Sequence, residues 1–181
     1  MIGFSSVLII LLLVALPATV SAQFVDITPP VLANPGNGSG AAWGDYDQDG
    51  DEDLFLSSSS PGSKLFRNEG SNVFVDGTGS MPGTSSHNRG CAWGDYDNDG
   101  DLDLFVAVWG GADKLIRNDG GGVFSDVTSG PIGNNGNATG ASWVDYDNDN
   151  DVDVLVSQYG PLLLWRNDGL NTFVNTTPPS F

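Results

Sequence analysis

The sequence predicts an all-β fold, a β-propeller-like array of three four-stranded blades that forms a partial or open propeller. Three observations support this prediction. The chain repeats itself with a period of 50 residues, its apolar residues come in short runs separated by Gly, Asn, Asp and Ser, and it contains 25 glycines. Short β-prone runs between turn residues are typical of antiparallel strands, and a fixed period indicates stacked structural repeats.

The repeat defines the blades. The run Gly-Ala-Ala-Trp-Gly-Asp-Tyr-Asp at 40–47 returns with small changes at 90–97 and 140–147. The repeat region at 23–181 is therefore expected to contain three blades, at about 31–78, 79–128 and 129–177. In the first blade, the four expected strands lie near 40–45, 53–57, 64–67 and 73–78.

Two features concern how the blades pack. Trp43, Trp93 and Trp143 recur at one position, and each is expected to pack against a neighbouring blade, since one blade cannot cover its own apolar faces. An extra copy of the fourth segment at 24–28 predicts one additional strand before the first blade. Closed propellers use about four to eight blades, so either further blades or self-assembly would have to close a ring, or the array stays open.

The first 22 residues are expected to be a secretion signal. An uninterrupted apolar run at 7–16 is followed by Pro17 and by the small-residue site Val20-Ser21-Ala22. An uncleaved membrane anchor is the alternative, but the run is shorter than the roughly 20 apolar residues of a spanning helix. The sequence thus predicts a secreted, cell-surface or periplasmic protein that does not insert into the membrane after removal of the signal. Cys91 is the sole cysteine and is expected to be a small, buried strand residue.

The charge of the chain limits its partners. The formal net charge is -17, so nucleic acid and anionic membrane surfaces are excluded as partners by repulsion. Most of the 23 acidic residues lie in three short windows rather than over the whole chain. This clustering favours cations as the complement of the acids.

Each window has the pattern of a metal-binding loop, because its carboxylates fall at alternate positions. A loop that wraps Ca²⁺ supplies about six to eight oxygens, with side chains from positions 1, 3, 5 and 9 and the carbonyl of position 7, and a glycine at position 6 permits the turn. We expect about three calcium ions, one per repeat. The predicted metal-site residues are Asp45, Asp47, Asp49, Asp51 and Asp53, then Asp95, Asp97, Asp99, Asp101 and Asp103, then Asp145, Asp147, Asp149, Asp151 and Asp153.

Other interpretations of these windows are weaker. An acidic turn that binds nothing does not explain three copies in register. An EF-hand loop requires a Glu at position 12, where this chain has Leu56, Val106 and Val156. Magnesium demands tight octahedral geometry, and transition metals favour His or Cys, which these loops lack.

The repeated motifs carry a family resemblance. WGDYDQDGDEDLFL at 43–56, WGDYDNDGDLDLFV at 93–106 and WVDYDNDNDVDVLV at 143–156 resemble the FG-GAP-like (VCBS) repeats of integrin-alpha-type β-propellers and of secreted proteins such as cartilage acidic protein. The resemblance implies one blade per repeat, calcium in the loop between the first two strands, and a role in adhesion or extracellular recognition. The third repeat departs from the pattern at Val144 and Asn150.

A partner-binding surface is predicted at the opposite end of the blades, where the loops differ between repeats. There, Trp109 and Tyr159 occupy the position of Ser59. They can stack on a sugar or anchor a protein, or they can simply pack at the edge of a blade.

The expected function is that of a secreted calcium-binding module for protein or glycan recognition, and not that of an enzyme. The sole histidine, His87, lies in a Gly-, Ser- and Asn-rich loop and has no evident nucleophile beside it. The alternatives are a propeller-type hydrolase or lyase acting on extracellular polysaccharide, and a purely structural fragment of a larger propeller protein.

Overall fold

A computed structural model describes residues 25–33, 36–82, 87–133 and 136–179. In this part of the chain, all regular structure except two short 3₁₀ helices is β-strand. The predicted signal segment at 1–22 lies outside the described residues. Among the described residues, no helix has the length and apolar character that a membrane crossing would need.

The strands form three four-stranded antiparallel sheets, and each sheet follows the chain order, so every blade is a meander. The predicted three-blade array is confirmed. The first blade contains β1 (Gly38–Gly44), β2 (Asp53–Ser58), β3 (Lys64–Asn68) and β4 (Phe74–Asp76). The second contains β5 (Asn88–Gly94), β6 (Asp103–Val108), β7 (Lys114–Asn118) and β8 (Phe124–Asp126). The third contains β9 (Ala138–Val144), β10 (Asp153–Gln158), β11 (Leu163–Asn167) and β12 (Phe173–Asn175).

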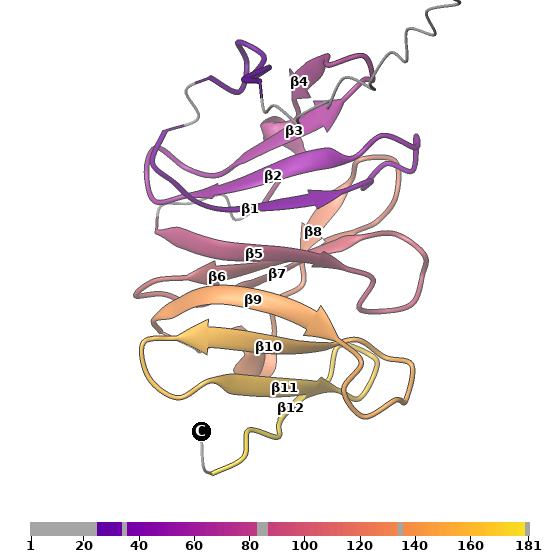
Figure 1. The fold of residues 1–181 in the computed structure, drawn as a ribbon. Helices are drawn as coiled ribbons and strands as arrows, with labels where there is room; N and C mark the ends of the chain where they lie inside the picture. The colour runs from indigo at the N-terminus through magenta and orange to yellow at the C-terminus, as the bar shows by residue number, and fades with distance from the viewer. Residues whose placement is uncertain (1–24, 34–35, 83–86, 134–135, 180–181) are drawn as a thin grey trace, which may run out of the picture.

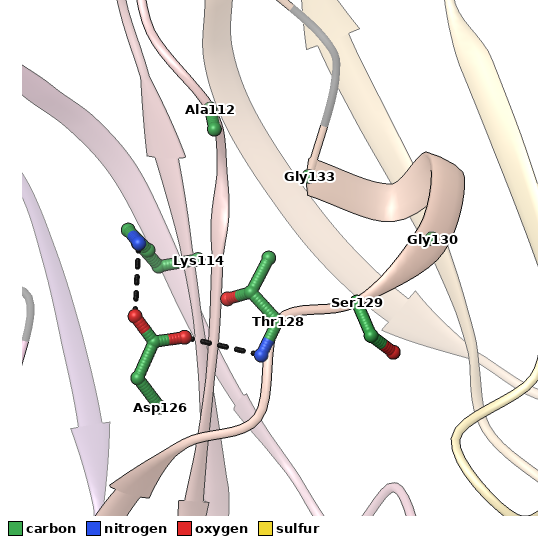
Figure 2. A pocket seen from close by; sticks show the side chains of 7 residues that line it. All are labelled: Ala112, Lys114, Asp126, Thr128, Ser129, Gly130 and Gly133. Atoms are coloured by element: carbon green, nitrogen blue, oxygen red, sulfur yellow. Dashed lines mark hydrogen bonds and ion pairs between the residues drawn. The ribbon is translucent and has the colours of Figure 1, made fainter.

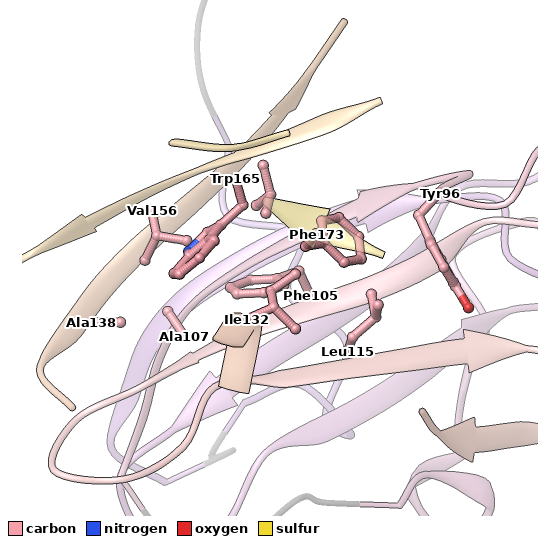
Figure 3. Packing of buried hydrophobic residues seen from close by; sticks show 10 residues of the cluster. Tyr96, Phe105, Ala107, Leu115, Ile132, Ala138, Val156, Trp165 and Phe173 are labelled. Carbon is pink, nitrogen blue, oxygen red and sulfur yellow. The ribbon is translucent and has the colours of Figure 1, made fainter. Parts of the chain in front are cut away.

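The blades stack face to face. Figure 1 shows them in chain order, with the first strands β1, β5 and β9 side by side along the array. The hydrophobic core lies between adjacent sheets. In Figure 3, Phe105 of the second blade and Ile132 of the following connection face Trp165 and Phe173 of the third. An equivalent cluster joins the first and second blades.

The repeated tryptophans pack across these junctions, with one exception. The indole Nε1 of Trp93 donates a hydrogen bond to the Ala42 carbonyl oxygen at 3.3 Å, and that of Trp143 donates to the Ala92 carbonyl oxygen at 3.1 Å. Trp43 is 56% exposed, because no described sheet precedes the first blade. The packing prediction is therefore correct for two tryptophans and wrong for Trp43.

The extra strand expected at 24–28 is not formed in the described part of that segment. Residues 25–28 belong to none of the three described sheets and lie instead beside Trp43 and Phe74. Asp26 still accepts hydrogen bonds from the backbone N–H and the hydroxyl of Thr28.

Similar turns follow the fourth strands of the complete blades. Figure 2 shows the one after β8, where Asp126 accepts hydrogen bonds from the Lys114 ammonium group and the Thr128 N–H and the chain then enters the 3₁₀ helix Gly130–Gly133. The open pocket drawn there has a volume of about 490 Å³. Its two charged side chains form an ion pair of 2.8 Å, so they serve the turn.

Candidate metal centres

The three acidic loops connect the first two strands of each blade, so all of them lie at the same end of the array. The turns between the third and fourth strands lie at this end too, and the Asp51 carboxylate sits against Gly70 of such a turn. Gly50 and Gly100 have φ of 94°, and Asn150 has φ of 76°. These left-handed conformations favour Gly and are tolerated by Asn, which explains why the turn position accepts both residues.

In each loop, three carboxylates converge, with ligand oxygens within 4.8 Å of one another. They come from positions 1, 3 and 9 in the first and third loops, and from positions 1, 3 and 5 in the second. The clusters are Asp45, Asp47 and Asp53, then Asp95, Asp97 and Asp99, then Asp145, Asp147 and Asp153.

The carboxylate at position 1 holds the turn of its loop. Asp45 accepts the backbone N–H groups of Asp49 and Gly50, both at 3.0 Å. Asp95 and Asp145 accept the corresponding N–H groups of their own loops. Because these bonds form within the loop, the carboxylates are positioned by local backbone before any ion binds.

The carboxylate at position 9 is fully buried and ties the loop to the third strand. Asp103 accepts the N–H of Tyr96 at 3.0 Å with one oxygen and the N–H of Asn118 at 2.9 Å with the other. Asp53 and Asp153 make the same pair of bonds in the other blades. The position-9 carboxylate therefore closes the hairpin loop in the same way in all three copies.

Electrostatics in the loops are unfavourable to ionised acids. Burial raises the pKa of Asp103 to about 7 and that of Asp53 to about 6. Burial, followed by the negative charge of Asp49, also raises the pKa of Asp47. The nearest basic group to Asp47 is Arg67, at 3.7 Å. A bound cation would favour the ionised forms and offset this cost.

The donor set suits a hard divalent cation. Each cluster consists of carboxylate oxygens alone, and Asp47 Oδ1 is buried with no hydrogen-bond partner in the described part of the chain. An unpaired buried carboxylate oxygen is costly unless another group, such as an ion, satisfies it. Calcium accepts such oxygen ligands in flexible geometry.

Some predicted residues lie outside the clusters. The acid at position 7 of the second and third loops links its loop to the preceding one. Asp101 accepts a hydrogen bond from the Gln48 side chain at 2.8 Å, and Asp151 accepts one from the Asn98 side chain at 2.6 Å. Gln48 and Asn98 were missed as functional residues, although an amide at position 4 of every loop was a visible signal. The predicted acids outside the clusters are Asp49, Asp51, Asp101, Asp103, Asp149 and Asp151.

A family model supports the repeat assignment. The model described as FG-GAP-like repeat matches residues 45–106 and 95–156. The chain belongs to the FG-GAP-like repeat family. The two matches overlap at the second loop and together include all three acidic loops. The comparison with curated proteins found no match, so the likeness to cartilage acidic protein stays a prediction.

At the opposite end of this FG-GAP-like array, the structure brings together the two aromatic residues predicted to bind a partner. The rings of Trp109 and Tyr159 lie 6.3 Å apart in an edge-to-face arrangement, and the Arg89 guanidinium lies over the Trp109 ring at 5.6 Å. Tyr159 is 82% exposed. His87 is exposed in this region, and its carbonyl oxygen accepts the N–H of Trp109.

Cys91 of the FG-GAP-like chain lies on β5 at the first junction. Burial raises the pKa of its thiol to about 11, so the thiolate that reacts with electrophiles and metals is disfavoured. Its sulfur lies 4.0 Å from the Phe55 carbonyl oxygen. These features agree with a packing role for this side chain.

Proposed function

We propose that this chain is a secreted calcium-binding repeat module that presents loops to an extracellular protein or glycan, and that it is not an enzyme. The observation that carries the proposal is the convergence of three carboxylates in each of three equivalent loops. Family membership adds support, since FG-GAP-like repeats are typically extracellular and non-catalytic and often bind calcium.

Calcium would act here as a structural ion. Each loop concentrates negative charge on a chain whose net charge is already -17, and repulsion between the carboxylates opposes folding. An ion held by Asp45 and Asp47 would offset part of the negative charge of the loop that joins β1 to β2. Because Gln48 hydrogen-bonds to Asp101, order in one loop would also favour order in the next.

Recognition is proposed for the variable end of the blades. Trp109 and Tyr159 offer aromatic surface there, and Arg89 adds a positive charge on an otherwise acidic chain. An exposed aromatic pair can stack on a sugar ring or anchor a protein loop. A role in adhesion fits an array that has acidic loops at one end and a recognition surface at the variable end.

A hydrolase or lyase on the same fold is the competing function. The close carboxylates could act as an acid and a base, yet they recur in three loops, which one active site would not need. His87 is exposed in a loop and lies near Trp109 rather than near the carboxylate clusters. Screening for cleavage of extracellular polysaccharides distinguishes this function from binding.

The calcium proposal is tested by titration calorimetry and thermal melting. We expect about three ions per chain, dissociation constants of about 10⁻⁴ to 10⁻³ M, and a melting temperature that rises with calcium. Replacing the three position-3 acids with asparagine should abolish the rise. The variant is Asp47→Asn, Asp97→Asn and Asp147→Asn.

A matched control removes the same number of charges at the same end of the array. Glu69→Gln, Asp119→Asn and Asp168→Asn alter exposed acids that pair with arginines rather than with the loops. This control should keep the calcium-dependent rise. A melting temperature that does not respond to calcium in the unaltered protein would contradict the proposal.

A further inference from the structure

The junction between blades is built in the same way twice. One blade contributes a projecting indole, Trp93 or Trp143, and the preceding blade contributes a socket. In the first socket, Tyr46 stacks on Trp93 with ring centroids 6.1 Å apart, and Phe55 meets it edge-on at 6.4 Å. In the second, Phe105 meets Trp143 edge-on at 6.1 Å.

Each of these sockets also depends on a glycine. A Cβ atom at Gly44 would lie 2.9 Å from the Trp93 ring, and one at Gly94 would lie 2.6 Å from the Trp143 ring. Both distances are too short for a real Cβ, so the close approach of the indole requires glycine here.

The two ends of the array carry the unused halves of this junction. On the first blade, the projecting indole is Trp43, which meets Phe74 at a centroid distance of 6.2 Å and is otherwise largely exposed. On the third blade, the socket positions hold Val144, Tyr146 and Leu155, which are 45%, 39% and 36% exposed. The counterparts of Tyr146 and Leu155 in the first two blades, which are Tyr46, Phe55, Tyr96 and Phe105, are buried in the junctions with the next blade.

The third socket has a different shape from the other two. Val144 replaces the glycine and adds an isopropyl group, while Leu155 replaces a phenylalanine and removes three of its seven side-chain carbons. Both positions line the same indole in the earlier sockets, so the third socket gains three side-chain carbons on the Val144 side and loses three on the Leu155 side. The third socket can therefore hold an indole displaced from Val144 toward Leu155.

A segment of the chain indicates what fits beside Trp43. Residues 25–30 read Val-Asp-Ile-Thr-Pro-Pro, and residues 174–179, from β12 onward, read Val-Asn-Thr-Thr-Pro-Pro. The former segment borders a groove of about 360 Å³ next to Trp43 and Phe74. Val25 and Ile27 are exposed, so the segment buries little apolar surface on the first blade, and the similar end of a third blade can replace it.

We propose that two copies of this chain associate head to tail, with Trp43 of each copy docking on the Val144, Tyr146 and Leu155 surface of the other. Such an interface is heterologous, and it closes on itself when a two-fold axis relates two junctions. Three blades from each copy then form a ring of six. That number falls within the range of about four to eight blades found in closed propellers.

The test measures molar mass by light scattering and sedimentation over a concentration series in millimolar calcium. The expected result is a dimer that dissociates on dilution. Trp43→Asp and Val144→Asp should each yield monomer, and an equimolar mixture of the two variants should recover a dimer through the one intact junction. Val123→Asp changes an exposed apolar residue of the second blade, away from both end faces, and should leave the dimer unchanged.

A second variant rebuilds the socket of the first two blades. Val144→Gly with Leu155→Phe should lower the dissociation constant of the dimer by about tenfold, a change that corresponds to one additional well-packed contact. Adding Trp43→Asp to this double variant should abolish the gain. Circular dichroism and melting confirm that each variant is folded, and Leu155→Asp replaces Val144→Asp if the latter unfolds.

Three outcomes would overturn the proposal. The unaltered protein could remain monomeric at every concentration, which would leave the two faces to blades of another chain or to solvent. A dimer that survives Val144→Asp would show that the first-blade faces pair with each other instead. A mixture of the two variants that stays monomeric would exclude a junction between unlike faces.

Discussion

The end of the sheets that carries the acidic loops, called the metal end, repeats nearly the same residues in every blade. The opposite end, which carries Trp109 and Tyr159 and is called the variable end, does not. At the metal end, Asp53, Asp103 and Asp153 make identical pairs of backbone hydrogen bonds in every blade. At the variable end, a single task is done by different residues, since the Ser63 hydroxyl accepts the Ser58 N–H in the first blade and the Asp113 carboxylate accepts the Val108 N–H in the second. A buried carboxylate with two fixed donors has few substitutes, whereas one turn bond can be made by several side chains.

The largest effect in this comparison is expected from Asp103→Ala. The substitution leaves the buried N–H groups of Tyr96 and Asn118 without their acceptor, and the unfolding free energy should fall by about 3 kcal/mol. Chemical denaturation with and without calcium measures it. Asp103→Asn keeps one acceptor oxygen and should lose less stability in the absence of calcium.

The matched substitution at the variable end is Asp113→Ser, which introduces the residue that the first blade uses. It should cost less than half as much as Asp103→Ala, because a serine hydroxyl makes the same turn bond at Ser63. Equal losses from the two substitutions would remove the distinction between the ends.

A smaller effect is expected where the metal end joins two blades. Asn118 Nδ2 donates to the Tyr46 carbonyl oxygen of the preceding blade at 2.8 Å, whereas Asn68 Nδ2 donates to Glu52 within its own blade at 3.1 Å. Asn118→Ala should cost about 2 kcal/mol because it leaves a buried carbonyl oxygen unpaired, and Asn68→Ala should cost about 1 kcal/mol. Thermal melting of the two variants side by side makes the comparison.

Each of the two asparagines also accepts an N–H from the glycine two residues later, but Asn118 is fully buried and Asn68 only partly so. The difference between the two losses therefore reports the contact between blades together with the deeper burial of Asn118. Losses of the same size would indicate that this bond contributes little to the packing of one blade on the next.

Periodicity made most of the fold predictable. The hairpin loop, its glycine turn and the closing acid repeat at fixed positions, and each is explained by bonds within one blade. The arrangement of acids inside a loop was less predictable, because alternation places Asp47 and Asp51 alike, while the fold directs Asp47 into a cluster and sets Asp51 against Gly70.

Contacts between blades were the hardest to predict. The link from Gln48 to Asp101 joins residues in successive loops, and no local pattern shows which side chains meet across a junction. Trp43 was misplaced for a related reason, since its repeat position predicts burial but no sheet in the described part of the chain covers it on that side. A repeat therefore defines the interior of each blade better than the faces at the two ends of the array.

The smallest effects on stability are expected at the aromatic pair of the variable end. Tyr159→Ala removes a side chain that is mostly in solvent, and it should change the unfolding free energy by less than about 0.5 kcal/mol. Trp109→Ala also removes the cation–π contact with Arg89 and should cost about 1 kcal/mol. Neither substitution should alter calcium binding, because both residues lie at the opposite end from the loops. Calorimetry that showed weaker calcium binding in either variant would mean that the two ends are coupled through the strands. The metal end and the variable end would then not act separately.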